Sequence, residues 1–131
     1  MSKTQVVAAI IQKNSKFLLG RRSPSKKSAA GYWSPISGKV EIGESEAGAV
    51  VRECFEEVGL TVEATQKITE FEIDQGTAQL HWWLVRILDG QEFLKNDEHT
   101  ELRWFSIQEM RQTPGFFQED IEVFSKINGE Q

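Results

Sequence analysis

Residues 38–60 read GKVEIGESEAGAVVRECFEEVGL, and this stretch contains the best-defined helix that the sequence predicts. Ser45 is a suitable N-cap, residues 47–58 show helical spacing, and Gly59 can adopt the left-handed conformation that ends a helix. On a helical wheel of about 100° per residue, the apolar side chains form one stripe that must face the core. The stripe comprises Ala47, Val50, Val51, Cys54 and Val58. Cys54 is therefore interpreted as a core residue and not as a nucleophile.

Three glutamates of this helix, Glu53, Glu56 and Glu57, lie at positions i, i+3 and i+4, so their side chains share a different face. Their repulsion costs an isolated helix roughly a few tenths of a kcal/mol per pair. Mg²⁺ or Mn²⁺ would turn this repulsion into a binding site, because both ions favour carboxylate oxygens and keep open positions for substrate phosphates. For three glutamates on an arbitrary helix, a solvated acidic face is the better interpretation.

The residues around the helix favour the metal site over the solvated face. Seven polar or glycine residues stand at a fixed spacing, namely Gly38, Glu44, Arg52, Glu53, Glu56, Glu57 and Gly59. With about one chance in twenty at each position, a random match is roughly one in a billion per window. The pattern resembles a complete Nudix box, and the strand order and length of the whole chain are similar to the MutT-like branch of that family.

The resemblance implies a fold and a set of site residues. The fold would be α+β, an α/β/α sandwich with a mixed β-sheet, in which the box forms a loop, a helix and a loop. Glu53, Glu56 and Glu57 would bind the divalent cations, and Glu53 would also help to deprotonate the attacking water. Arg52 would orient Glu53 or its neighbours through charged hydrogen bonds, and Glu44 would support the metal ligands from the second layer.

The loop before the helix supplies further candidates by the same resemblance. Gly38 would allow the backbone to approach metal or phosphate closely. Members of the family often have Pro-Gly-Gly here, whereas this chain has Ile36-Ser37-Gly38, so ligation by a backbone carbonyl is less firmly implied. Lys39 and Arg22 would contact phosphate oxygens, and a solvated surface charge is an equally good interpretation of each.

Members of the family often carry another acid far downstream that reaches the metals or the water. Glu98 is the first candidate in this chain, with Glu101 and Asp97 as alternatives. Acidic residues are common on protein surfaces, so a solvated position is at least as good an interpretation of any one of the three. The two histidines, His81 and His99, show no recognisable spacing and are expected to be structural or exposed rather than catalytic.

The rest of the chain predicts strands at residues 5–13, 17–19, 32–40, 61–73, 77–88 and 101–105. Turns at residues 14–15 and 74–76 would close two hairpins, and residues 23–31 and 89–100 read as loops. Ser106 and Glu109 match a capping box that opens a short helix. Thr113-Pro114 would cap a final helix, whose apolar stripe is Phe117, Ile121, Phe124 and Ile127. This order of elements indicates an α+β or α/β sandwich with mixed strand directions.

Length and composition fit one domain over residues 1–131. The single cysteine excludes an intrachain disulfide and favours a cytoplasmic location. The longest aliphatic run, residues 6–11, is far shorter than a membrane span, and no membrane association is expected. The formal net charge of −5 disfavours bulk binding to nucleic acid, but clustered acids with their cations would still bind a polyphosphate. The chain is expected to be a monomer or a homodimer.

The resemblance implies an Mg²⁺-dependent hydrolase that cleaves the diphosphate linkage of a small nucleotide, a nucleoside diphosphate linked to another group. Because the domain is minimal, a MutT-like (d)NTP pyrophosphohydrolase is the first expectation. NDP-sugars, dinucleoside polyphosphates and RNA 5′ ends are alternative substrates, and a Nudix-fold binding module without catalysis is the alternative function. A ring of Tyr32-Trp33 or Trp82-Trp83 near the site would stack on a nucleobase, although core packing explains most of these aromatics better.

Overall fold

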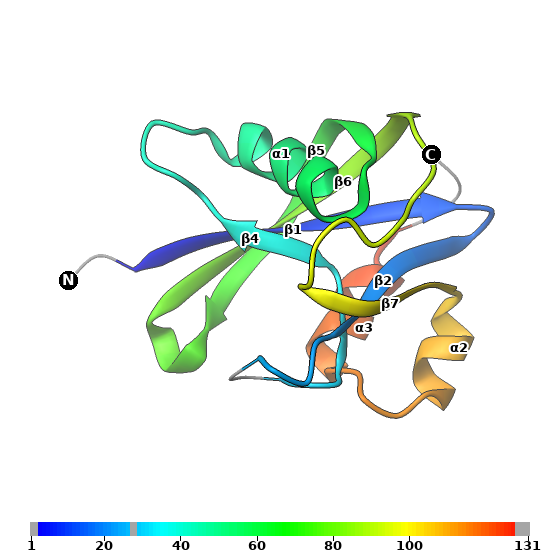
Figure 1. Cartoon of the computed structure of the whole chain (residues 1–131). Coiled ribbons are helices and arrows are strands. Elements are labelled where there is room, and N and C mark those ends of the chain that lie inside the picture. Colours follow the sequence, from blue (N-terminus) through cyan, green and yellow to red (C-terminus); the bar gives the residue numbers. More distant parts are fainter. Residues whose placement is uncertain (1–2, 27–28, 128–131) are drawn as a thin grey trace.

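A central mixed sheet organises the protein, as the computed structural model shows for residues 3–26 and 29–127 (Figure 1). The strands are β1 (Thr4–Lys13), β2 (Lys16–Arg22), β3 (Trp33–Ser34), β4 (Ile36–Lys39), β5 (Thr61–Ile73), β6 (Ala78–Asp89) and β7 (His99–Phe105). The helices are α1 (Glu46–Val58), α2 (Ile107–Gln112) and α3 (Gln118–Ser125), with a short 3-10 turn η1 (Asp74–Gly76).

Strand β1 lies at the centre of the sheet and fixes its mixed character. It runs parallel to β6 and antiparallel to β2 and β4, while β5 pairs antiparallel with β6 and β7 with β2. The predicted turn between β1 and β2 is confirmed: Asn14 and Ser15 have φ values of 53° and 63°, as a two-residue hairpin loop requires. The parallel pairing with β6 and the antiparallel pairing with β2 confirm the expected mixture of strand directions.

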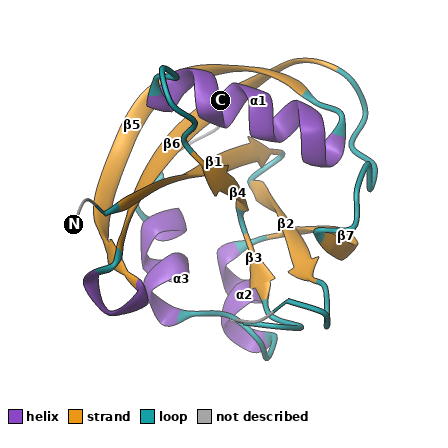
Figure 2. Cartoon of the chain, turned by 60° about the vertical axis from the view of Figure 1, so that its left-hand side comes forward, coloured by secondary structure: helices purple, strands orange, loops and turns teal. Residues whose placement is uncertain are grey.

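Each face of the sheet buries its own apolar cluster. Val7, Ala9 and Ile11 of β1 pack with the buried stripe of α1, whereas Ala8 and Ile10 face the other cluster, because side chains alternate along a strand. Residues of α2 and α3 contribute to that second cluster. Figure 2 shows α1 on one side of the sheet and α2 and α3 on the other. This is the expected α+β sandwich.

Helix α1 is capped as its sequence predicts. The Ser45 hydroxyl accepts a hydrogen bond from the Gly48 amide at 2.9 Å, and Gly59 ends the helix with φ 71°. Val50, Cys54 and Val58 are fully buried, so the interpretation of Cys54 as a core residue is confirmed. Among the helices of the described residues, none is long and apolar enough to span a bilayer.

Two expectations for the C-terminal part need correction. Thr113-Pro114 does not cap the final helix, because α3 begins at Gln118 and its N-cap residue, Phe117, makes no capping side-chain bond. Thr113 instead closes α2, and its hydroxyl donates to the Glu109 carbonyl at 2.6 Å. Strand β7 also begins earlier than expected, at His99, because that residue pairs with Arg22 of β2.

Removing a ring from the cluster under α3 tests this packing. Phe124 is fully buried and contacts the rings of Phe17 and Trp82 at centroid distances of 4.9 and 5.6 Å. Phe124→Ala is expected to lower the free energy of unfolding by about 3–5 kcal/mol, measured by urea denaturation. Leu88→Ala, at a side chain that is 53% exposed, should change it by less than about 0.5 kcal/mol. Equal losses in the two variants would contradict the assignment of this core.

Candidate active site

The guanidinium of Arg52 joins the loop before α1 to the glutamates on the helix. Two of its nitrogens donate to the two carboxylate oxygens of Glu44 at 2.7 and 2.9 Å, a bidentate arrangement. It also donates to Glu53 at 2.9 Å, to Glu56 at 3.0 Å and to the carbonyl of Lys39 at 2.9 Å. The hydrogen bond from Arg52 lowers the pKa of Glu44 to about 2, so this acid stays ionised at neutral pH.

Glu53 and Glu57 form a carboxyl pair on the inner side of α1. The two groups are close enough to affect each other's pKa, and their side chains are 13% and 4% exposed. Burial raises the pKa of both carboxyls above the ordinary glutamate range, and the neighbouring acid adds to the increase at Glu53. The pair therefore tends to retain a proton that a cation would replace.

His99 contacts the Glu57 member of this pair. Its Nε2 lies 3.1 Å from Oε1 of Glu57, and both side chains are buried. Burial lowers the pKa of His99 to about 4, which keeps the imidazole neutral. Sequence reasoning placed this histidine outside the site because its partner stands 42 positions earlier in the chain.

Glu56 does not join the carboxyl pair. Its side chain is 53% exposed and contacts Arg52, four residues before it, on the outer side of the helix. Within residues 3–26 and 29–127, no three Asp, Glu, His or Cys side chains are grouped so that they could hold a metal ion. The structure thus brings together two of the three glutamates that the sequence grouped.

The chemistry at this end nevertheless fits a hard divalent cation. The donors are carboxylate oxygens, which Mg²⁺ and Mn²⁺ prefer. The Gly38 backbone lies so close to the pair that an added Cβ would stand 2.1 Å from the Glu53 carboxylate. Glycine is needed here because the Glu53 carboxylate itself occupies the place that a side chain would take. Gly38 thus lets the acid pack directly against the backbone of β4.

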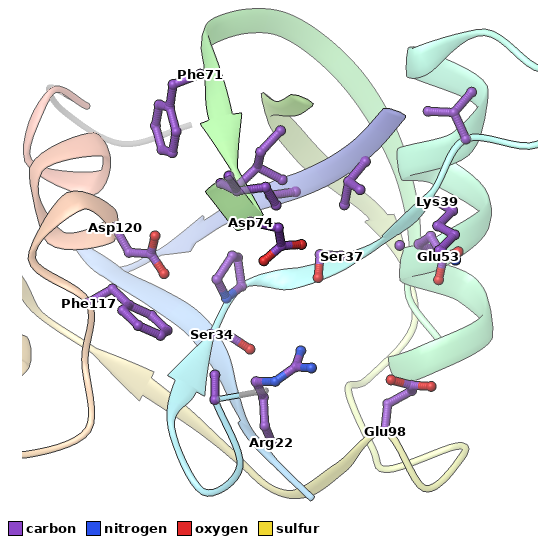
Figure 3. A pocket seen from close by; sticks show the side chains of 18 of the residues that line it. Arg22, Ser34, Ser37, Lys39, Glu53, Phe71, Asp74, Glu98, Phe117 and Asp120 are labelled. Atoms are coloured by element: carbon purple, nitrogen blue, oxygen red, sulfur yellow. The ribbon is translucent and has the colours of Figure 1, made fainter. Parts of the chain in front are cut away.

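A single cleft of about 1430 Å³ extends from the carboxyl pair across the sheet. Figure 3 shows Glu53 and Lys39 at one end, Arg22 and Glu98 below them, and Phe117 with Asp120 at the opposite end. Its volume exceeds the roughly 300–1,000 Å³ of typical small-molecule pockets. The cleft therefore has enough volume for a ligand with a charged part and an aromatic part.

Among the downstream acids, Glu98 lines the cleft together with Glu53 and Glu57, whereas Asp97 and Glu101 are not part of its lining. Lys26 pairs with Glu98, with 2.5 Å between the ammonium and a carboxylate oxygen. The structure thus places the first of the three candidates beside the carboxyl pair. Lys39 and Arg22, the basic candidates, also line the cleft.

The end remote from the carboxyl pair holds residues that no sequence motif indicated. Ser34 and Asp120 are buried, and the Ser34 hydroxyl has no hydrogen-bond partner among the described residues. Burial raises the pKa of Asp120 to about 7. The Phe117 ring stacks on Tyr32 at a centroid distance of 4.7 Å. Of the aromatics considered in the sequence, Trp33 and Trp82 are core residues, as expected.

Comparisons with known proteins agree with the box and the fold. The profile of the NUDIX domain matches residues 1–127. CTP pyrophosphohydrolase of Escherichia coli K12 is 37% identical over 116 residues, which cover 87% of this chain and 84% of that protein. The 8-oxo-dGTP diphosphatase of the same strain is 33% identical over 110 residues, covering 82% and 83%. The structure of a MutT protein from Methanosarcina mazei Go1 shares the fold, with a TM-score of 0.80, 24% identity and coverage of 95% and 92%. The chain therefore belongs to the Nudix hydrolase family.

Proposed function

We propose that this protein hydrolyses a nucleoside triphosphate to the nucleoside monophosphate and pyrophosphate, with water attacking phosphorus. Both Escherichia coli relatives are named for nucleoside triphosphate substrates, CTP and 8-oxo-dGTP, and match more than four-fifths of this chain.

One observation carries the proposal: the carboxyl pair and an aromatic, partly polar end lie in the same cleft. Glu53 and Glu57 provide oxygen donors at one end, and Lys39 and Arg22 line the walls near them. Phe117 lies at the other end. A nucleotide has matching parts, because its phosphates need cationic partners and its base offers a flat face for an aromatic ring.

The residues of the box then have separate roles in the reaction. Glu53 in its ionised form accepts the proton of the attacking water, and the hydrogen bond from Arg52 favours that form. Arg52 fixes Glu53 by a hydrogen bond of 2.9 Å, and Glu44 holds the guanidinium by two more. Lys39 and Arg22 contact phosphate oxygens. These residues orient the acid and the substrate relative to each other.

The cofactor is Mg²⁺, with Mn²⁺ as an alternative. Glu53 and Glu57 would hold it, with Glu98 from the facing loop, Gly38 through its backbone, and Glu56 once its contact with Arg52 is released. When bound, the ion neutralises phosphate charge and lowers the pKa of a water molecule. Such ions offset the repulsion between the carboxylates of the site and a polyanionic substrate.

The same fold also suits other nucleotide substrates and a binding function without catalysis. A further relative, from Actinobacillus succinogenes, is named as an NAD-capped RNA hydrolase, so NDP-sugars, dinucleoside polyphosphates and RNA 5′ ends belong in any substrate test. In a binding module without catalysis, the helix would serve as a scaffold. The network of Arg52 with Glu44, Glu53 and Glu56 argues against that alternative, since a scaffold has no need of four charged residues in this register. The cytoplasmic location and the monomeric or dimeric state stay predictions.

Replacing the proposed base tests the mechanism. Glu53→Gln keeps the size and the hydrogen-bonding ability of the side chain but cannot accept the proton, so turnover with Mg²⁺ should fall about a hundredfold or more. The control is Glu63→Gln, at an exposed acid of β5 that pairs with Arg86, and it should retain full turnover. Unchanged turnover in Glu53→Gln would remove Glu53 from the mechanism, and absence of turnover in the unaltered chain on every substrate would favour the binding module.

The planar fork of Arg52 can be tested separately from its charge. Arg52→Lys keeps the positive charge but cannot hold Glu44, Glu53 and the Lys39 carbonyl together, so kcat should fall roughly tenfold or more. The matched control, Arg86→Lys, changes an exposed arginine whose partner is Glu63 and should leave kcat unchanged. A kcat in Arg52→Lys equal to that of the unaltered chain would show that a point charge is sufficient.

A substrate panel addresses the chemical class of the ligand. With Mg²⁺ present, (d)NTPs including CTP and 8-oxo-dGTP should release pyrophosphate with a higher kcat/KM than NDP-sugars, dinucleoside polyphosphates or capped RNA. Product identification by chromatography distinguishes pyrophosphate from phosphate. Cleavage of NDP-sugars alone would contradict the triphosphate proposal while leaving the family membership intact.

A further inference from the structure

We infer that His99 is a positioning residue that fixes the carboxylate of Glu57 for binding the divalent cation. This inference rests on the proposed function, because it assigns a role toward the metal ion of the same site. His99 lies outside the box, at the first position of β7. The contact that suggests the role is the approach of its Nε2 to Oε1 of Glu57 at 3.1 Å.

The contact lies in a part of the structure where both groups have little freedom. The side chains of His99 and Glu57 are 5% and 4% exposed, so water does not compete for the hydrogen bond. The preceding loop is tied to the end of α1, because the Lys95 amide donates to the Glu57 carbonyl and the Phe93 amide to the Val58 carbonyl, each at 3.1 Å. These backbone bonds bring β7 to the helix and set the position of the imidazole.

The backbone of β2 also restricts the imidazole ring. It packs on Gly20 of β2, where an added Cβ would stand 2.4 Å from Nδ1 and 2.5 Å from Cγ. The strand register pairs Arg22 with His99 after an irregularity between Arg21 and Arg22. Because the ring lies against backbone on one side and against Glu57 on the other, it presents Nε2 in one direction only.

A ring fixed in this way suits the chemistry of a metal-binding carboxylate. An N–H group at Nε2 donates to one oxygen of Glu57 and leaves the other oxygen for the cation. A residue that only filled space would need neither the nitrogen nor its direction toward the acid.

A pair of near-isosteric variants tests the role. His99→Gln retains an N–H donor at a similar reach, whereas His99→Met has a similar length and no donor. Binding of Mn²⁺ alone, measured by isothermal titration calorimetry, should weaken about ten- to a hundredfold in His99→Met, and His99→Gln should recover most of the loss. Thermal unfolding midpoints, recorded in parallel, show whether the two variants are equally folded.

The outcomes separate this inference from the proposed function. Equal Mn²⁺ affinity in His99→Met and His99→Gln overturns the inference and leaves the metal site intact, whereas no Mn²⁺ binding by the unaltered chain overturns both. If His99→Met does not fold, Gly20→Ala takes its place, because the added methyl must displace the ring without changing any site residue. This variant should bind Mn²⁺ at least tenfold more weakly, and unchanged affinity would overturn the inference.

Discussion

Glu53 and Glu57 place two acid groups side by side at a largely buried position, and the rest of the site follows from this arrangement. Two like charges that lack water repel each other and must share a proton or a cation. Arg52 relieves part of the repulsion at Glu53, and His99 contacts the far side of Glu57. The cost of burying these acids is thus offset by partners from α1 itself and from β7.

The fold provides the rigid frame that this arrangement needs. Helix α1 is fixed on the sheet by a fully apolar stripe, so its two inner glutamates cannot rotate away from β4, where Gly38 leaves room for them. The other face of the sheet is covered by α2 and α3. Their connection brings Phe117, and α3 itself brings Asp120, to the opposite end of the same cleft. One sheet therefore positions the acidic end and the aromatic end with different helices.

The sequence predicted the features that are local along the chain. The caps of α1, the hairpin at Asn14-Ser15 and the capping box at Ser106 depend on residues within a few positions of each other. The buried stripe of α1 was predicted except at one turn, where Ala49 is buried and Ala47 is not. Spacing alone could not show that Glu56 contacts Arg52, because a carboxylate at i+4 on the helix can contact the arginine as easily as a metal. Thr113-Pro114 was a local signal for a cap that the chain uses to end α2 instead.

Contacts between distant segments were beyond the reach of the sequence. The partners His99 and Glu57 meet through the pairing of β7 with β2, and Ser34 reaches the same cleft as Asp120 only after the sheet has formed. No spacing rule connects residues of this kind. The box therefore indicated the chemistry, while the tertiary structure supplied the residues around it.

The most direct test of the account is a crystal structure of the protein with Mn²⁺ and a non-hydrolysable nucleoside triphosphate, in which anomalous scattering locates the ion. The account predicts a peak within roughly 2.0–2.5 Å of carboxylate oxygens of both Glu53 and Glu57, in contact with the phosphates. A peak bound only at other acids, with Glu53 and Glu57 still paired to each other, would contradict it.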